Sequence, residues 1–259
     1  MKHRWYFLTL FVLLAFLLSP NSTRAEGEID SDNDGLSDYE EIHIYHTDPN
    51  NKDTDGDGYL DGEEVRNGFS PLVPGKKMSE VDTDNDGLTD EMEIKLKTDL
   101  GSFDTDGDKA TDGEEVFRGD DPLVPGPSRT TVERKVEVDL SSQKLFYFMN
   151  GVKLGEMYVS TGMLKTPTPR GEFEIQRKVP VIHYIGEDYN LPNTKWNLQF
   201  KKSYYLHGAY WHNQFGIRPM SHGCVNIAYK DVEKLYSFMD VGDKVYIYGK
   251  TPLKRLKKT

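Results

Sequence analysis

Residues 220–226 read MSHGCVN, and they hold Cys224, the one cysteine in a chain of 259 residues. An unpaired cysteine is either an inert core residue, half of an intermolecular disulfide or a reactive thiol. The compartment in which the chain works bears on that choice, because disulfides form and persist in exported proteins. The start of the chain indicates the compartment.

The N-terminus has the pattern of a secretory signal peptide. Basic residues occupy positions 2–4, an apolar run of 14 residues spans 5–18, and Thr23-Arg24-Ala25 offers small residues for cleavage after Ala25. A 14-residue helix spans about 21 Å, less than the roughly 30 Å of a hydrocarbon core. We therefore expect residues 1–25 to be removed and the mature chain to be exported without a transmembrane helix.

Charge divides the mature chain into two parts. Residues 26–126 contain 31 Asp and Glu against 8 Lys and Arg, a net charge of −23, whereas residues 127–259 contain 12 against 21, a net charge of +9. A reversal of that size predicts two domains with different roles, separated near a Pro/Gly turn cluster. The expected division is a signal peptide (1–25), an acidic domain (26–126), a linker (127–131), a second domain (132–250) and a basic tail (251–259).

The acidic domain repeats one twelve-residue pattern four times, as DSDNDGLSDYEE (30–41), DTDGDGYLDGEE (53–64), DTDNDGLTDEME (82–93) and DTDGDKATDGEE (104–115). Each segment has Asp at positions 1, 3, 5 and 9 and Glu at position 12, and three have Gly at position 6. The starts are 23, 29 and 22 residues apart, so the segments form two longer repeats.

Alternating carboxylates in a tight loop suit Ca²⁺, which binds about six to eight oxygen ligands. Four such loops in register predict structural calcium sites rather than a disordered acidic tail. The candidate ligands are Asp30, Asp32, Asp34, Asp38, Glu41, Asp53, Asp55, Asp57, Asp61, Glu64, Asp82, Asp84, Asp86, Asp90, Glu93, Asp104, Asp106, Asp108, Asp112 and Glu115.

These loops resemble bacterial thrombospondin type 3 repeats more than EF-hands, because turn residues 47–51 leave no entering helix before Asp53. Short exiting helices are expected over 38–45 and 90–97. The fourth loop has Lys109 at position 6, where a positive φ costs roughly 1 kcal/mol, so we expect its site to be the weakest. Because the carboxylates repel one another, we expect this spacer or adhesion module to need calcium to fold.

The second domain changes to the period of β-strands. Apolar and polar residues alternate from Val132, and strands are predicted over 136–140, 145–148, 157–159, 204–206 and 244–248, with one helix over 231–239. The result is a mainly β domain of about 120 residues, large enough for its own core.

Within this β domain Cys224 has the neighbours that a nucleophile needs. A thiolate requires a histidine within reach and N–H groups for an oxyanion, and His207 and His222 are each followed by glycine. His212 is an alternative base that lacks the following glycine. One Cys and scattered His do not match a zinc site.

Three motifs together resemble the L,D-transpeptidases of the bacterial cell wall, whose catalytic domain is of the YkuD type. SHGCVN (221–226) is similar to their cysteine signature, His207-Gly208 to the upstream histidine, and TG (161–162) with TPTPRGEF (166–173) to a preceding segment. The spacing departs slightly, since 13 residues separate His207 from Ser221. The resemblance covers about 132–249. It implies a mainly β fold, a YkuD-like β-sandwich with a short helix, preceded by the irregular calcium-loop domain with its short helices.

The resemblance also implies roles for individual residues. Cys224 is the expected nucleophile and His207 the base, and the N–H groups of Gly223 and Cys224 are the expected oxyanion donors. Ser221, His222 and Asn226 are expected to shape the site. Arg218 is a candidate for binding a substrate carboxylate, from its charge alone.

The expected function is peptidoglycan cross-linking in the periplasm or cell envelope of a bacterium, without a catalytic cofactor. The expected partners are stem peptides and, as an adduct, a carbapenem; a nucleic-acid partner is not expected. Two alternatives stay open: an L,D-carboxypeptidase that trims tetrapeptide stems, and a calcium-dependent wall-binding or adhesion protein with a vestigial enzyme domain.

Overall fold

Alternating apolar residues build a three-stranded meander at the start of the β domain. β1 (Arg134–Asp139), β2 (Lys144–Met149) and β3 (Val152–Ser160) pair antiparallel, and each includes residues for which the sequence predicts a strand. Val136 and Val138 are fully buried because every second side chain of β1 faces the core. The computed structural model describes residues 29–187, 189–253 and 256, so the predicted signal peptide lies outside the described residues.

Nine strands form one continuous sheet in the order β4-β9-β1-β2-β3-β8-β7-β6-β5. The remaining strands are β4 (Gly171–Glu174), β5 (Arg177–Ile185), β6 (Asn190–Lys201), β7 (Tyr204–Ala209), β8 (Val225–Ala228) and β9 (Lys244–Tyr248). The predicted strands at β7 and β9 are confirmed, and β4, β5, β6 and β8 were not predicted.

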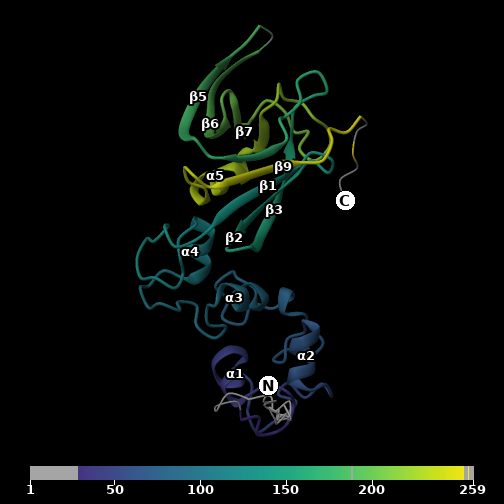
Figure 1. Cartoon of the computed structure of the whole chain (residues 1–259), viewed down its shortest axis with the longest axis vertical. Helices are drawn as coiled ribbons and strands as arrows, with labels where there is room; N and C mark the ends of the chain where they lie inside the picture. The colour runs from purple at the N-terminus through teal and green to yellow at the C-terminus, as the bar shows by residue number, and fades with distance from the viewer. Residues whose placement is uncertain (1–28, 188, 254–255, 257–259) are drawn as a thin grey trace, which may run out of the picture.

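The sheet curls so that its two halves enclose one core, which confirms the mainly β fold class. Leu145 and Val138 of the first half and Leu206 and Ile227 of the second belong to the same buried cluster. The predicted helix is α5 (Tyr229–Phe238), whose Leu235 also enters this core. β5 and β6 extend as a hairpin at the end of the molecule farthest from the repeats (Figure 1).

The acidic domain consists of turns and short helices. They are α1 (Asp38–Glu40), continued by a π-helical turn η1 (Glu41–Tyr45), then α2 (Asp61–Asn67), the 3₁₀ turn η2 (Met78–Glu80), α3 (Asp90–Leu96) and α4 (Asp112–Arg118). In each twelve-residue segment an α-helix begins at position 9 and leads out of the loop. The predicted exiting helices are therefore confirmed. Among the described residues, no helix is long and apolar enough to span a bilayer.

The four loops pair as two units. The N–H of Gly62 in the second loop donates to Asp34 of the first at 3.0 Å, and the N–H of Gly113 donates in the same way to Asp86 of the third. A Cβ at either glycine would lie within 2.6 Å of a backbone carbonyl oxygen, so the loops approach too closely for any other residue. We call residues 30–75 the distal pair and residues 82–126 the proximal pair.

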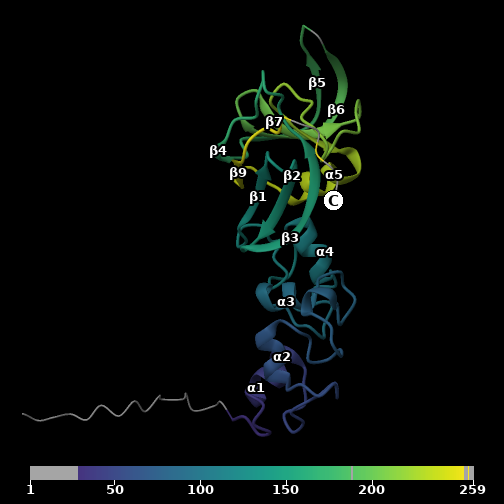
Figure 2. The same ribbon diagram turned by 90° about the vertical axis from the view of Figure 1, so that its right-hand side faces the viewer.

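The proximal pair packs against the β domain, whereas the distal pair lies beyond it (Figures 1 and 2). Leu88, Leu96 and Val116 of the proximal pair belong to the same buried cluster as the sheet. Arg129 of the predicted linker donates to Asp240 and to the carbonyl of Phe238, both at the end of α5. The linker is therefore held between the two parts of the molecule.

Candidate active site

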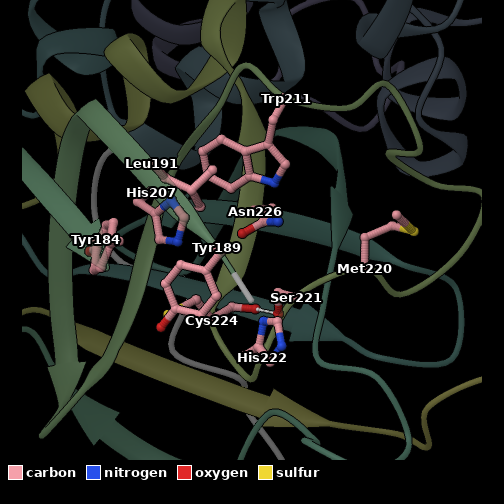
Figure 3. A pocket seen from close by; sticks show the side chains of 10 residues that line it. All are labelled: Tyr184, Tyr189, Leu191, His207, Trp211, Met220, Ser221, His222, Cys224 and Asn226. Atoms are coloured by element: carbon pink, nitrogen blue, oxygen red, sulfur yellow. Dashed lines mark hydrogen bonds between the residues drawn. The ribbon is translucent and has the colours of Figure 1, made fainter. Parts of the chain in front are cut away.

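Two parallel strands position the cysteine and the histidine. β7 pairs with β8 so that His207 lies opposite Asn226, and Cys224 immediately precedes β8. Both side chains line one cavity of about 220 Å³ (Figure 3). The arrangement brings together, across 16 intervening residues, the two groups that the sequence assigns as nucleophile and base.

The residues before Cys224 form a loop that is fixed by its own hydrogen bonds and by residues 161–168. Ser221 Oγ donates to the carbonyl of Cys224 and accepts the N–H of Gly223 at 3.1 Å. The carbonyl of Ser221 accepts the N–H of Met163 at 3.0 Å, and Gly162 N–H donates to Thr168 Oγ1 at 2.8 Å. The TG and TPTP segments also bind Ser221 directly, since its N–H donates to the carbonyl of Thr161 at 3.1 Å and its carbonyl accepts the hydroxyl of Thr166 at 3.2 Å.

Gly223 is required by conformation and by packing. Its φ is +118°, and a Cβ there would lie 2.6 Å from the Tyr204 ring. Gly208, the glycine that follows His207, has the same packing constraint, because a Cβ would lie 2.4 Å from the Tyr229 ring. Both His-Gly pairs thus owe their glycine to a neighbouring tyrosine.

His207 is held as a neutral base. Its Nδ1 lies 2.9 Å from the carbonyl oxygen of Gly208, so Nδ1 carries the proton and Nε2 is left as the acceptor. The ring lies between Tyr184 and Trp211, with centroids at 5.1 and 5.9 Å. Burial lowers the pKa of His207 to about 4, so the imidazole is uncharged at neutral pH.

The Cys224 thiol is also uncharged at rest. Burial raises its pKa to about 11, although the N–H of Tyr205 acts in the opposite direction. Its Sγ lies 3.9 Å from the carbonyl oxygen of Ser203. A neutral thiol and a neutral imidazole that line one cavity suit general-base activation, in which the proton moves to nitrogen as sulfur attacks.

Several lining residues were not predicted from the sequence. Tyr184, Tyr189 and Leu191 come from the β5–β6 hairpin, and Trp211 and Met220 from the segment between β7 and β8. Tyr184 is fixed by a hydrogen bond from its hydroxyl to Asn197 Oδ1 at 3.0 Å. The aromatic residues of 184–211 were visible in the sequence, but nothing local assigns them to the same cavity as Cys224.

Three predicted residues differ in their position relative to the Cys224 cavity. His222 lies at the rim, with its ring 5.1 Å from the ring of Tyr189. Asn226 is 1% exposed and lines the cavity. Arg218 is exposed and lies in a neighbouring hollow with Lys165 and Pro219, so the structure does not bring it into the Cys224 cavity.

The four acidic loops share one geometry. In each loop the carboxylates of positions 1, 3 and 5 have oxygens within 4.8 Å of one another. The N–H of position 6 donates to the Asp at position 1 in all four, including Lys109 at 2.9 Å. The φ of Lys109 is +82°, which confirms the strained conformation expected for a lysine in place of glycine.

Buried carboxylate oxygens without a hydrogen-bond partner face into these loops. Among the described residues they belong to Asp30, Asp32, Glu41, Asp55, Glu64, Asp82, Asp84, Glu93, Asp106 and Glu115. Burial and then neighbouring aspartates raise the pKa of Glu41, Glu64 and Glu115 to about 7 and that of Glu93 to about 9. A hard cation that prefers oxygen ligands, such as Ca²⁺, fits these groups, because it would coordinate the unpartnered oxygens and neutralise their charge.

The aspartates at position 9 have another role within the loops. Both oxygens of Asp61 accept hydrogen bonds from Thr54, through its N–H at 2.8 Å and its hydroxyl at 2.6 Å. Asp38, Asp90 and Asp112 bind the residue at position 2 of their own loops in the same way. Position 9 therefore closes the loop, while positions 1, 3, 5 and 12 surround its centre.

Comparison with known proteins finds a matching family for each of the two parts of the chain. Residues 133–247 match the model of the L,D-transpeptidase catalytic domain, YkuD. Residues 30–52, 53–68, 82–99 and 104–125 match the bacterial TSP3 repeat. The two resemblances inferred from the sequence are thereby confirmed.

Individual relatives are distant. YkuD of Bacillus licheniformis, to which an L,D-transpeptidase activity is ascribed, is 26% identical over 136 residues, which cover 52% of this chain and 78% of the relative. A solved L,D-transpeptidase from Mycobacterium smegmatis is 26% identical, with a TM-score of 0.44. L,D-transpeptidase 3 from Mycobacterium tuberculosis, solved with a faropenem-derived adduct, is 22% identical, with a TM-score of 0.43. In both cases 49% of this chain is covered and it spans 64% of the solved chain, less than two thirds.

Proposed function

We propose that this chain is an exported peptidoglycan L,D-transpeptidase that cross-links stem peptides through a thioester on Cys224. The observation that carries the proposal is the cavity shared by the single thiol and a histidine whose Nδ1 is anchored to Gly208. The match of 133–247 to the catalytic domain supports the substrate class. The proposed domains are 26–126 and 132–250, joined by 127–131.

In the proposed reaction, Nε2 of His207 takes the thiol proton as Cys224 Sγ attacks the carbonyl of the L,D bond. That bond joins the diamino acid of a donor stem to the D-alanine that follows it. The C–N bond breaks, the proton on His207 passes to the leaving D-alanine amine, and a thioester remains. An amine of a second stem then attacks the thioester and forms the cross-link, the C–S bond breaks, and the proton that the amine loses passes through His207 to the Cys224 sulfur.

We further propose that the four loops bind Ca²⁺ through positions 1, 3, 5 and 12. The unpartnered buried oxygens at positions 1, 3 and 12, and the close approach of the carboxylates at positions 1, 3 and 5, support this assignment. The ion would supply charge neutralisation and cross-linking within each loop. The loops then act as a stiff spacer that carries the catalytic domain in the cell envelope.

Replacing the nucleophile tests the catalytic proposal. Cys224→Ala should lower turnover of tetrapeptide stems on the order of 10⁴-fold or more, because the covalent step is lost. A carbapenem should add the mass of one drug molecule to the wild-type chain and none to Cys224→Ala. His43→Ala, an exposed residue of η1, is the control and should keep the adduct. Wild-type turnover in Cys224→Ala would contradict the proposal.

The nature of the acceptor separates the two catalytic outcomes. Incubation of the chain with purified disaccharide-tetrapeptides, followed by mass spectrometry, should yield cross-linked dimers and free D-alanine. Tripeptide products without dimers would instead identify an L,D-carboxypeptidase, in which water resolves the thioester. Neither product, with calcium bound to the loops, would favour a wall-binding protein with a vestigial enzyme domain.

A further inference from the structure

A second histidine contacts the wall of the active-site cavity. His212 lies in the segment between β7 and β8, and its Nε2 is 2.9 Å from the side-chain amide of Asn226, at Nδ2. Asn226 is 1% exposed, lies two residues after Cys224 and lines the cavity. His212 itself is half-buried, with its ring against Phe215.

The hydrogen bonds of His212 determine where its proton lies. Its Nδ1 accepts the backbone N–H of Gln214 at 3.2 Å, so in a neutral imidazole the proton is on Nε2. Burial and then the charge of Arg218 lower the pKa of His212, which favours the neutral ring. An Nε2–H group can donate only to an acceptor, and the side-chain amide of Asn226 offers one in Oδ1.

This proton position determines the direction of the Asn226 amide. A half-turn about the last side-chain bond exchanges the amide oxygen and nitrogen, which have nearly the same shape. Oδ1 then accepts from His212 Nε2, and the NH₂ group takes the position that faces the cavity. That position now holds Oδ1, which is buried and has no hydrogen-bond partner, so the exchange also satisfies an orphaned oxygen.

The position now held by Asn226 Oδ1 faces the reacting groups. Figure 3 shows the oxygen end of the Asn226 amide turned toward the side of the cavity where His207 lies, and the nitrogen end turned away from it. The backbone N–H of Gly223, one of the two expected oxyanion donors, is engaged with Ser221 Oγ at 3.1 Å. A side-chain donor at this point of the wall therefore adds a hydrogen bond where the N–H of Gly223 is already engaged.

We propose that His212 is a positioning residue that holds the Asn226 amide with its N–H groups toward the substrate. In that orientation Asn226 donates to a carbonyl oxygen of the stem peptide. The proposal rests on the proposed transpeptidase function for the identity of the substrate. It also removes His212 from the role of an alternative base, because its Nε2 carries a proton that is committed to Asn226.

Kinetics of single and double variants test the coupling. His212→Ala and Asn226→Ala should each lower kcat for tetrapeptide stems about 10- to 100-fold, with a smaller change in KM, because a donor that orients a substrate carbonyl in the transition state is lost. In an Asn226→Ala background, His212→Ala should have little further effect, since the two residues act through one amide. His212→Gln, which offers an N–H near the place of Nε2, should recover part of the rate, and His43→Ala should behave as the wild type.

Independent effects that multiply in the double variant would overturn the proposal, because a merely structural role of His212 would not depend on Asn226. So would a wild-type rate in His212→Ala. Near-equal losses in the two single variants and in the double variant would support it.

Nuclear magnetic resonance decides the same point without any catalysis. The ¹⁵N shifts of the His212 ring at neutral pH should show a protonated Nε2 and an unprotonated Nδ1. The neutral tautomer with the proton on Nδ1 would overturn the proposal, even in an active enzyme. Conversely, a chain that fails to turn over stems but shows the Nε2–H tautomer would refute the proposed function and leave the His212–Asn226 assignment standing.

Discussion

The distal and proximal loop pairs have nearly the same sequence pattern and the same loop hydrogen bonds, yet they differ in what surrounds them. Gly68 and Gly119 end equivalent helices with φ values of +77° and +87°. A Cβ at Gly68 would meet nothing within 4 Å, whereas one at Gly119 would lie 2.4 Å from the carbonyl oxygen of Phe238. One repeat unit therefore serves as an exposed spacer and the other as part of an interface.

The apolar residues show the same difference. Val116 of the proximal pair is fully buried in the cluster shared with the β domain, and the equivalent Val65 is only half-buried. Arg134, 5% exposed, ties the junction by donating to Gly119 O at 2.8 Å and to Asp243 at 2.9 Å. We infer that calcium in the proximal pair stabilises the catalytic domain, while calcium in the distal pair stiffens only the spacer.

Removal of calcium should produce the largest effect. At a hundredfold excess over Kd, each independent site contributes about 2.7 kcal/mol, so two proximal sites contribute about 5 kcal/mol. We expect EDTA to unfold the distal pair and to lower the Tm of the β domain by several degrees. Calorimetry of the mature chain, with near-UV circular dichroism for the β domain, measures both. An unchanged β-domain transition would mean that the two parts unfold independently.

Loss of one proposed calcium ligand in each pair separates the roles of the two pairs. Glu93→Gln and Glu41→Gln remove equivalent, fully buried carboxylates at position 12. Each should cost about 2–3 kcal/mol of calcium-linked stability at saturating metal. Only Glu93→Gln should lower the temperature at which carbapenem acylation is lost. Equal effects of the two variants on acylation would mean that the distal and proximal pairs stabilise the catalytic domain equally, which would contradict the inferred difference between them.

The helix-ending glycines provide a smaller, purely steric test. Gly68→Ala and Gly119→Ala both carry the cost of a positive φ, roughly 1 kcal/mol. Gly119→Ala should lose about 1–3 kcal/mol more, because its methyl group overlaps the Phe238 carbonyl oxygen. Urea unfolding of the two variants in calcium measures the difference. Equal losses would show that the junction yields without strain.

The smallest effect is expected at position 6 of the fourth loop. Lys109→Gly should stabilise the proximal pair by about 1 kcal/mol and tighten its calcium binding, since glycine adopts φ +82° without strain. The reciprocal Gly58→Lys, at a position with open space around it, should weaken the distal pair by a similar amount. Isothermal titration of both variants compares the sites; a Lys109→Gly variant that binds calcium more weakly would contradict the strain argument.

The elements that the sequence predicted depend on contacts within a short stretch of chain. The loops at 30–41 and 82–93 form through side chains that bind backbone groups two to seven residues away, so their spacing alone specifies them. The strands of 134–149 show a clear period of two. By contrast, β5 and β6 carry a mixed pattern of exposed and buried residues, which obscured their alternation.

The repeat, the cysteine motif and the mainly β class can be read from the sequence alone, because each depends on residue types at fixed local spacing. That Tyr184 and Trp211 flank His207, that His212 meets Asn226 and that Gly119 abuts Phe238 emerges from the folded structure. These contacts join elements that are distant in sequence or meet only after the sheet has curled. Their energies depend on side-chain packing across those elements, and no local pattern records it.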